Sequence, residues 1–150
     1  MKYITLIALF FCCVFTANAQ LGFNHITAKG GLGINGGANF EIGYETNKKY
    51  NNNWSLFFSG YVNEEVRNWT TGLYYEPNLV ASKNNLLNFK IGTSLGTNED
   101  RFIIDAILGL EYNYAFNRNM KFTVFFKNNR MFNSVDKFRH SILIGFKHRL

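Results

Sequence analysis

The stretch Phe102–Tyr114, FIIDAILGLEYNY, decides the fold of this chain. Its even-numbered positions are apolar or aromatic throughout, whereas its odd-numbered positions include Asp105, Glu111 and Asn113. Successive side chains of a strand point to opposite faces, so a period of two predicts a β-strand. Because the polarity is split so cleanly over so long a run, we expect a transmembrane barrel strand, with lipid on one face and a polar lumen on the other.

The same alternation continues on both sides of this stretch and gives eight runs, the smallest number usual for such barrels. The runs are His25–Ile34, Ala38–Thr46, Trp54–Asn63, Trp69–Ala81, Leu87–Leu95, Phe102–Tyr114, Lys121–Lys127 and Phe138–Leu150. A tilted strand needs about 9–11 residues to cross the hydrocarbon, and all the runs except Lys121–Lys127 are at least that long. No repeat or linker divides residues 20–150. The sequence therefore predicts one all-β domain, an eight-stranded antiparallel up-and-down transmembrane β-barrel.

The connections between the runs differ in length. Asn35-Gly36-Gly37 is a tight-turn signal, and 82–85 and 117–119 are short turns. Residues 64–68 and 128–137 are polar and predict longer loops. An even number of strands that starts in the periplasm also ends there, so we expect the two short turns on the periplasmic side and the longer loops outside. Pro77 cannot donate to a strand ladder and predicts a bulge or a strand end.

Residues 1–19 have the features of a cleaved signal peptide: Lys2, an apolar run from Ile4 to Phe15, and the cleavage site Ala17-Asn18-Ala19. Both cysteines, Cys12 and Cys13, lie inside it, so the mature chain cannot form a disulfide. A domain of about 130 residues then needs another source of stability, and closure of a barrel in a membrane supplies one. We expect export to the outer membrane of a Gram-negative bacterium.

The net charge is +6, and loss of Lys2 with the signal lowers it to +5. A basic balance of this size suits contact with anionic lipid headgroups or lipopolysaccharide, and we expect such lipids to be partners. It would also suit nucleic acid, although we expect no direct nucleic-acid binding. Trp54, Trp69, Tyr44, Tyr75, Tyr112 and Tyr114 stand at or near run ends, as in the aromatic belts of membrane barrels.

Charged residues inside the runs all have the polar parity, which predicts a charge network in the lumen. Its members are Lys29, Glu41, Glu45, Glu76, Lys90, Asp105, Glu111, Lys127, Arg139 and Lys147, with Lys121 on the same parity. Buried charges are costly unless they are paired, so we expect a salt-bridged plug; a proton or ion path is the alternative. Apolar residues also share the inward parity, namely Phe57, Ile103, Ile107, Phe125 and Leu143, which favours a filled interior over a water channel.

No pattern in the chain indicates catalysis, a metal or a cofactor. His140 is next to Ser141, but adjacent strand residues point to opposite faces and cannot act as nucleophile and base. The glycines at 30, 31 and 33 precede no helix, so they predict close packing or curvature and not a phosphate loop. We expect a protein that is not an enzyme. The alternatives are a small barrel enzyme acting on lipid or lipopolysaccharide, a lipid-binding barrel, and a soluble β-sandwich binding module.

Several blocks of the chain resemble the TraO family of conjugative-transposon transfer proteins from Bacteroidetes. The blocks are Asn53-Trp54, Leu73–Glu76, Phe89–Gly96, Gly109–Glu111, Phe138–His140 and Gly145–Lys147, together with Ala19-Gln20 at the end of the signal. The resemblance covers nearly all of the mature chain and is carried by spaced glycine, aromatic and charged positions. It implies an outer-membrane β-barrel that serves a conjugation apparatus, with other proteins of that apparatus as partners. It implies no catalytic residues.

Overall fold

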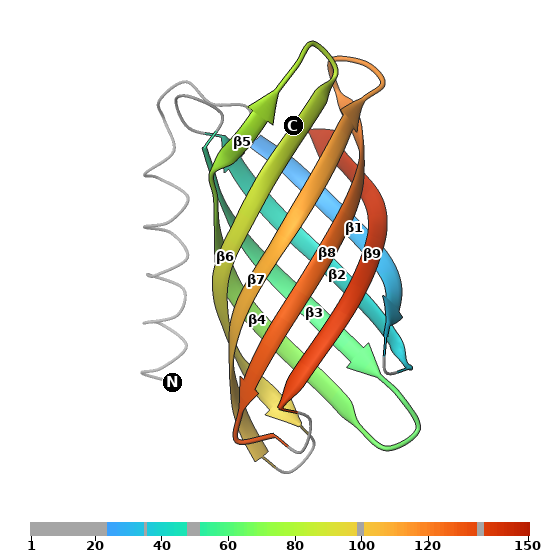
Figure 1. Ribbon diagram of the computed structural model, residues 1–150, viewed down its shortest axis with the longest axis vertical. Helices are drawn as coiled ribbons and strands as arrows, with labels where there is room; N and C mark the ends of the chain where they lie inside the picture. Colours follow the sequence, from blue (N-terminus) through green and yellow to red (C-terminus); the bar gives the residue numbers. More distant parts are fainter. Residues whose placement is uncertain (1–23, 35, 48–51, 99–100, 135–136) are drawn as a thin grey trace, which may run out of the picture.

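The computed structural model describes residues 24–150 except 35, 48–51, 99–100 and 135–136, so the predicted signal peptide, residues 1–19, lies outside the described residues. The described chain is built from strands joined by turns (Figure 1). The strands are β1 (Asn24–Gly33), β2 (Ala38–Asn47), β3 (Asn53–Val62), β4 (Arg67–Glu76), β5 (Asn78–Ala81), β6 (Asn85–Asn98), β7 (Arg101–Ala115), β8 (Met120–Phe132) and β9 (Phe138–Arg149). Among these residues there is no helix that is long and apolar enough to span a membrane.

The strands form one closed antiparallel barrel, in which neighbours in sequence pair with each other except β4 and β5. The first and last strands close it, because β1 pairs with β9 from His25 opposite Arg149 to Gly33 opposite Ser141. β4 and β5 both pair with β6 and together form one side of the barrel, so the nine strands make an eight-stranded up-and-down barrel. The predicted fold class is confirmed.

Pro77 separates β4 from β5, as the sequence predicts. A proline has no N–H, yet its carbonyl still accepts a hydrogen bond from the Phe89 amide, at 3.0 Å. The ladder between β5 and β6 then shifts register between Asn78 and Val80. The run Trp69–Ala81 is therefore a single side of the barrel that is broken at its proline.

Two predicted loops are shorter than expected, because strands extend into them. The polar segment 64–68 loses its last two residues to β4, which begins at Arg67. The prediction of a loop over the whole of 128–137 is also wrong, because β8 continues to Phe132. In both places polar side chains on a strand resemble a loop in sequence. The run Leu87–Leu95 likewise extends to the full length of β6.

Both described ends of the chain lie on one rim of the barrel, here called the terminal rim (Figure 1). The amide of Leu150 donates to the carbonyl of Asn24 at 2.9 Å, and that of Arg149 donates to the carbonyl of Asn119 at 2.8 Å. The short turns 82–84 and 116–119 belong to the same rim. The opposite, distal rim carries the connections at 34–37, 63–66, 99–100 and 133–137, as the alternation of strands requires.

The turn between β1 and β2 is as tight as its sequence predicts. Gly36 and Gly37 both have positive φ, 84° and 91°, a region that glycine enters without steric cost. The amide of Gly36 donates to the carbonyl of Gly33 at 3.0 Å, and the amide of Gly33 donates to the carbonyl of Gly37 at 3.0 Å. Asn35, the first residue of the turn signal, lies outside the described residues.

The alternation of polarity becomes an alternation between inside and outside. In β7 the side chains of Ile103, Asp105, Ile107 and Glu111 are at most 2% exposed, whereas Leu108 is 51% exposed. On other strands Phe58, Ile144 and Phe146 are also 45–50% exposed on the outer face. A β-sandwich would bury these apolar side chains against a second sheet, so the sandwich alternative is wrong. The outer apolar face is larger than a water-soluble monomer ordinarily presents.

Aromatic side chains gather on the outer face towards the strand ends. Trp54 contacts Tyr75, with ring centroids 5.1 Å apart, and Trp69 stacks on Phe58 at 5.8 Å. Tyr112 and Tyr114 are also exposed, 40% and 38%, near the terminal rim. Tyr44, another predicted member, is only half-buried. The positions match those that interfacial aromatic belts require.

Gly31 stands where β1 and β9 close the barrel, and it faces the lumen. A Cβ atom built there would lie 1.8 Å from the carbonyl oxygen of Ile142, which is backbone and cannot rotate away. Its neighbour Gly30 faces outward, with nothing within 4 Å of such an atom. The predicted close packing is therefore a property of Gly31 and not of Gly30.

We expect Gly31→Ala to lower the free energy of unfolding by about 1–3 kcal/mol, the usual range for overpacking. Gly30→Ala is the matched control on the opposite face and should change it by less than about 0.5 kcal/mol. Urea titration of both variants, folded in detergent, measures the difference. Equal effects at the two positions would mean that β1 and β9 do not approach each other as described.

Candidate functional site

The centre of the barrel holds eight buried charged side chains, four acidic and four basic, which we call the lumen cluster. No member is more than 5% exposed. The members come from seven strands and are Lys29, Glu41, Glu45, Glu76, Lys90, Glu111, Lys127 and Lys147. Since the two signs are equal in number, the cluster can be neutral as a whole. That balance is what allows so many charges to be buried together.

Glu111 on β7 is the most connected member. Its Oε2 lies 2.8 Å from Lys29 Nζ and 2.9 Å from Lys90 Nζ. Its Oε1 contacts Lys147 Nζ. These lysines come from β1, β6 and β9, so one carboxylate links three strands across the lumen.

Glu41 on β2 forms a second centre. Its Oε1 is 3.0 Å from Lys29 Nζ and its Oε2 is 2.9 Å from Lys127 Nζ. The hydroxyl of Tyr74 donates to the same Oε2 at 2.8 Å. Lys29 therefore bridges Glu41 and Glu111, which joins the two centres into one network.

Glu45 and Glu76 complete the cluster on the side of the terminal rim. Lys147 Nζ donates to Glu45 and lies 3.7 Å from Glu76 Oε2, while Lys90 Nζ is 2.8 Å from Glu76 Oε1. Neutral groups donate to the same carboxylates: Asn53 Nδ2 donates to Glu45 at 2.7 Å, and the Ser55 hydroxyl donates to Glu76.

Three carboxylates of the cluster have the spacing of a metal site. Oxygens of Glu45, Glu76 and Glu111 lie within 4.8 Å of one another. Lys147 Nζ, however, contacts all three of them. The chain's own ammonium group thus takes the position that a cation would need, and the arrangement is an internal salt-bridge centre.

The apolar inward residues pack around these charges. Phe57, Tyr74, Ile107, Phe125 and Leu143 form the buried core. The rings of Phe57 and Tyr74 stack with their centroids 4.1 Å apart. Lysine ammonium groups lie over the rings: Lys29 Nζ is 4.7 Å from the Phe125 centroid, and Lys127 Nζ is 5.0 Å from that of Phe57. Cation–π contacts thus hold the charges in addition to the ion pairs.

Asp105 and Arg139 belonged to the predicted network but lie apart from the lumen cluster, nearer the distal rim. Asp105 Oδ2 accepts from the Ser94 hydroxyl at 3.0 Å and from Asn129 Nδ2 at 3.3 Å. The guanidinium of Arg139 lies 3.5 Å from the centroid of the Tyr61 ring. Both side chains are buried in the lumen, as their parity predicts.

Two small cavities flank the lumen cluster within the described part of the barrel. A cavity of about 10 Å³ lies towards the terminal rim, lined by Asn53, Asn113 and Lys147 among others. Another of about 10 Å³ lies towards the distal rim, next to Asp105 and Arg139. Such a volume holds roughly one water molecule. The arrangement suits a plug, because hydrated ions need a wider path than these spaces offer.

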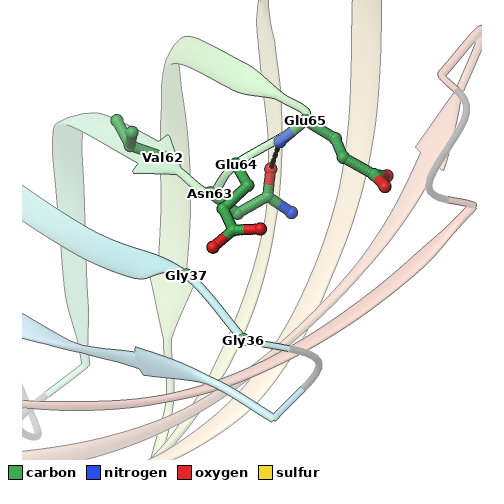
Figure 2. A pocket seen from close by; sticks show the side chains of 6 residues that line it. All are labelled: Gly36, Gly37, Val62, Asn63, Glu64 and Glu65. Carbon is green, nitrogen blue, oxygen red and sulfur yellow. Dashed lines mark hydrogen bonds between the residues drawn. The ribbon is translucent and has the colours of Figure 1, made fainter.

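A wider groove of about 600 Å³ lies on the distal rim between the β1–β2 turn and the β3–β4 loop (Figure 2). Glu64 and Glu65 line it, opposite Gly36 and Gly37. The side-chain oxygen of Asn63 accepts a hydrogen bond from the Glu65 amide at 3.0 Å and shapes the loop. The groove is open to solvent and is separate from the lumen cluster.

The histidines do not form the constellation that a hydrolase requires. His140 Nδ1 lies against the side-chain oxygen of Asn128, its cross-strand neighbour on the outer face. His148 is exposed on the same face. His25 Nδ1 faces the lumen, 4.0 Å from Glu45. Within the described part of the chain, His140 therefore contacts an amide and not the nucleophile or acid that a hydrolase requires.

Sequence reasoning missed the neutral members that support the charges. Asn53, Ser55 and Asn129 are recognisable as inward only by parity, and nothing in the sequence says which carboxylate each one contacts. Tyr74 has the inward parity too, but its hydroxyl contact with Glu41 depends on the diameter of the barrel.

We expect Tyr74→Phe to lower the free energy of unfolding by about 1.5–3 kcal/mol, because hydrogen bonds to charged groups contribute about that much. Tyr75→Phe is the matched control, since Tyr75 faces outward on the next residue of β4. Urea titration in detergent micelles checks both. A larger loss for Tyr75→Phe would contradict the described inside and outside of β4.

Comparison with known protein families found no match, and neither did comparison with curated proteins. Solved structures are similar in fold. Neisserial surface protein A aligns with a TM-score of 0.64 at 12% identity, over 86% of this chain and 96% of the other. The Yersinia pestis outer membrane protein Ail aligns at 0.60 and 9%, over 87% and 100%. The outer membrane enzyme PagL aligns at 0.59 and 10%, over 84% and 99%. The chain therefore has the fold of outer-membrane-type eight-stranded barrels, which carry both enzymes and other proteins.

Proposed function

We propose that the protein is a closed, non-conducting β-barrel of the bacterial outer membrane that acts as a structural component of the cell envelope and not as an enzyme or a pore. The lumen cluster is the observation that carries this proposal. Eight charges, paired across seven strands, cross-link the interior, and the spaces beside them hold about one water molecule each. The exposed apolar outer face supports membrane insertion.

The orientation is proposed from the two described ends of the chain, which lie together on the terminal rim. We place this rim in the periplasm, from which an exported chain enters the membrane, and the distal rim outside; the connections of the two rims are similar in length and do not decide the orientation. Lipid is the immediate partner of the outer face. A leader at residues 1–19 supports export, and its cleavage is part of the proposal.

The process that the barrel serves is proposed from the sequence alone. We propose that the barrel belongs to a conjugative DNA-transfer apparatus, because several blocks of its sequence resemble the TraO family. In that role the barrel contacts other envelope proteins of the apparatus and does not bind DNA.

Three measurements test this proposal. Outer-membrane fractionation, with faster migration of the unboiled protein on gels, is expected; recovery in the soluble periplasm would overturn it. In planar bilayers the folded protein should produce no conductance steps, whereas regular steps would show an open lumen.

Deletion of the gene in a donor strain should abolish DNA transfer while growth is unchanged. Normal transfer would remove the conjugation role and leave the barrel itself untouched.

A further inference from the structure

A basic groove lies on the distal rim where β7 begins and where β8 and β9 meet. Its volume is about 410 Å³. The residues that matter to its chemistry are Arg101, Arg130, Phe132, Ser134, Lys137 and Phe138. It is separate from the lumen cluster, because Arg130, Phe132 and Phe138 belong to the outer face.

The backbone around the basic groove is held in place. The amide of Met131 donates to the carbonyl of Lys137 at 2.9 Å and closes the hairpin between β8 and β9. Asn133 has a φ of 63°, and its side chain donates to the carbonyl of Phe102 at 2.9 Å. These bonds tie the described part of the hairpin to β7.

The groove offers positive charge without an acidic counterpart among its described lining residues. Arg101, Arg130 and Lys137 are all exposed to solvent there. The Arg130 guanidinium is held between two rings, 5.3 Å from the Phe132 centroid and 5.7 Å from that of Phe138. Three acidic residues that neighbour these cations in the sequence, Glu99, Asp100 and Asp136, lie outside the described residues.

One buried polar atom in the groove lacks a hydrogen-bond partner in the described structure. It is the hydroxyl oxygen of Ser134. The residue itself is only half-buried, so its hydroxyl is available to donate to the acceptor oxygens of a ligand that enters the groove.

The outer face below the groove is also unusual. Arg130 and Asn128 follow each other on the outward parity of β8, and Asn128 pairs with His140 across to β9. Their neighbours Phe126 and Ile142 are apolar and exposed, 40% and 45%. A polar strip therefore descends from the groove into an otherwise apolar face. A ligand that fits both features has an anionic head and a polar linkage above its acyl chains.

We propose that the basic groove binds the phosphorylated headgroup of one membrane lipid. The phosphate lies among Arg101, Arg130 and Lys137, the Ser134 hydroxyl donates to one of its oxygens, and the ester or amide linkage faces Asn128 and His140. The site rests on the proposed membrane location, since the outer face must contact lipid for the linkage to reach the polar strip. Phosphate is well matched to arginine and lysine.

The test uses mature protein folded in a neutral detergent and native mass spectrometry, with phosphatidylglycerol as the probe and phosphatidylcholine as the zwitterionic control. One phosphatidylglycerol should bind preferentially. Arg130→Gln and Lys137→Gln should each weaken it about fivefold, the effect of one interfacial cation. Lys83→Gln, an exposed lysine on the terminal rim, should leave it unchanged. Lys137 lies in a loop, so its variant remains informative if Arg130→Gln does not fold.

Three results would overturn the lipid site. They are no preference for phosphatidylglycerol, an equal loss in Lys83→Gln and Lys137→Gln, and displacement of the lipid by an equal concentration of inorganic phosphate. The last would indicate a soluble anion as the ligand. Folding into phosphatidylcholine vesicles is measured separately by gel migration. Failure to fold into these vesicles would contradict the proposed membrane location. Folding without a preference for phosphatidylglycerol would contradict only the proposed lipid site.

Discussion

Glu111→Gln should lower the free energy of unfolding by about 3–5 kcal/mol, the range for removing one partner of a buried ion pair. The change removes one negative charge and leaves Lys29, Lys90 and Lys147 with an excess of positive charge inside the barrel. Glutamine has nearly the same shape, so the loss would report charge and not packing. Urea titration of the protein in detergent micelles measures it.

Glu65→Gln is the matched control for this prediction, because Glu65 is exposed in the β3–β4 loop. It should change the free energy of unfolding by less than about 0.5 kcal/mol. Lys147→Met should be as damaging as Glu111→Gln, since it leaves three carboxylates without their shared ammonium. If Glu111→Gln were tolerated as well as Glu65→Gln, the lumen cluster would not be the element that holds the interior.

Leu110→Lys should cost about 2–4 kcal/mol for folding into bilayers, because it places a charge in the hydrocarbon. Leu110 is next to Glu111 on β7 but is 43% exposed on the outer face. The measurement is the fraction folded in vesicles over a urea series, and the loss should be smaller in detergent, where the micelle adapts.

Met120→Lys is the control for Leu110→Lys, because Met120 also faces outward but begins β8 at the terminal rim. Near the interface a lysine costs only about 0–1 kcal/mol. An error of one residue in register would exchange the two faces. If Leu110→Lys folded in bilayers and Glu111→Lys did not, the even-numbered side chains of β7 would face the lumen and the odd-numbered ones the lipid, opposite to the arrangement described.

Much of the fold could be predicted from the period of two alone. In Phe102–Tyr114 each parity goes to one face, because a strand allows no other arrangement, and the same rule places Lys29, Glu41 and Lys147 inside. The break between β4 and β5 at Pro77 could be predicted for a local reason, because proline has no N–H to donate. These features depend on neighbours in sequence, so the sequence was sufficient.

Partners and strand ends could not be predicted in the same way. The diameter and register of the closed barrel decide which lysine reaches Glu111. The same two properties place Asp105 and Arg139 away from the lumen cluster. The end of β8 was obscured because Asn128 and Arg130 face outward, where an apolar side chain is the usual signal of a strand. The same outward-facing side chains contribute to the basic groove, through Arg130, and to the polar strip below it, through Asn128.

The most direct test of the central claim uses the two native tryptophans. Trp54 and Trp69 both face outward, 45% and 41% exposed, Trp54 towards the terminal rim and Trp69 towards the distal rim. In vesicles of brominated phosphatidylcholine, bromine near the glycerol end of the acyl chains should quench both more strongly than bromine at mid-chain, with Trp54→Phe and Trp69→Phe separating the signals. Absence of quenching in both, from protein that is folded, would contradict a barrel whose outer face contacts lipid.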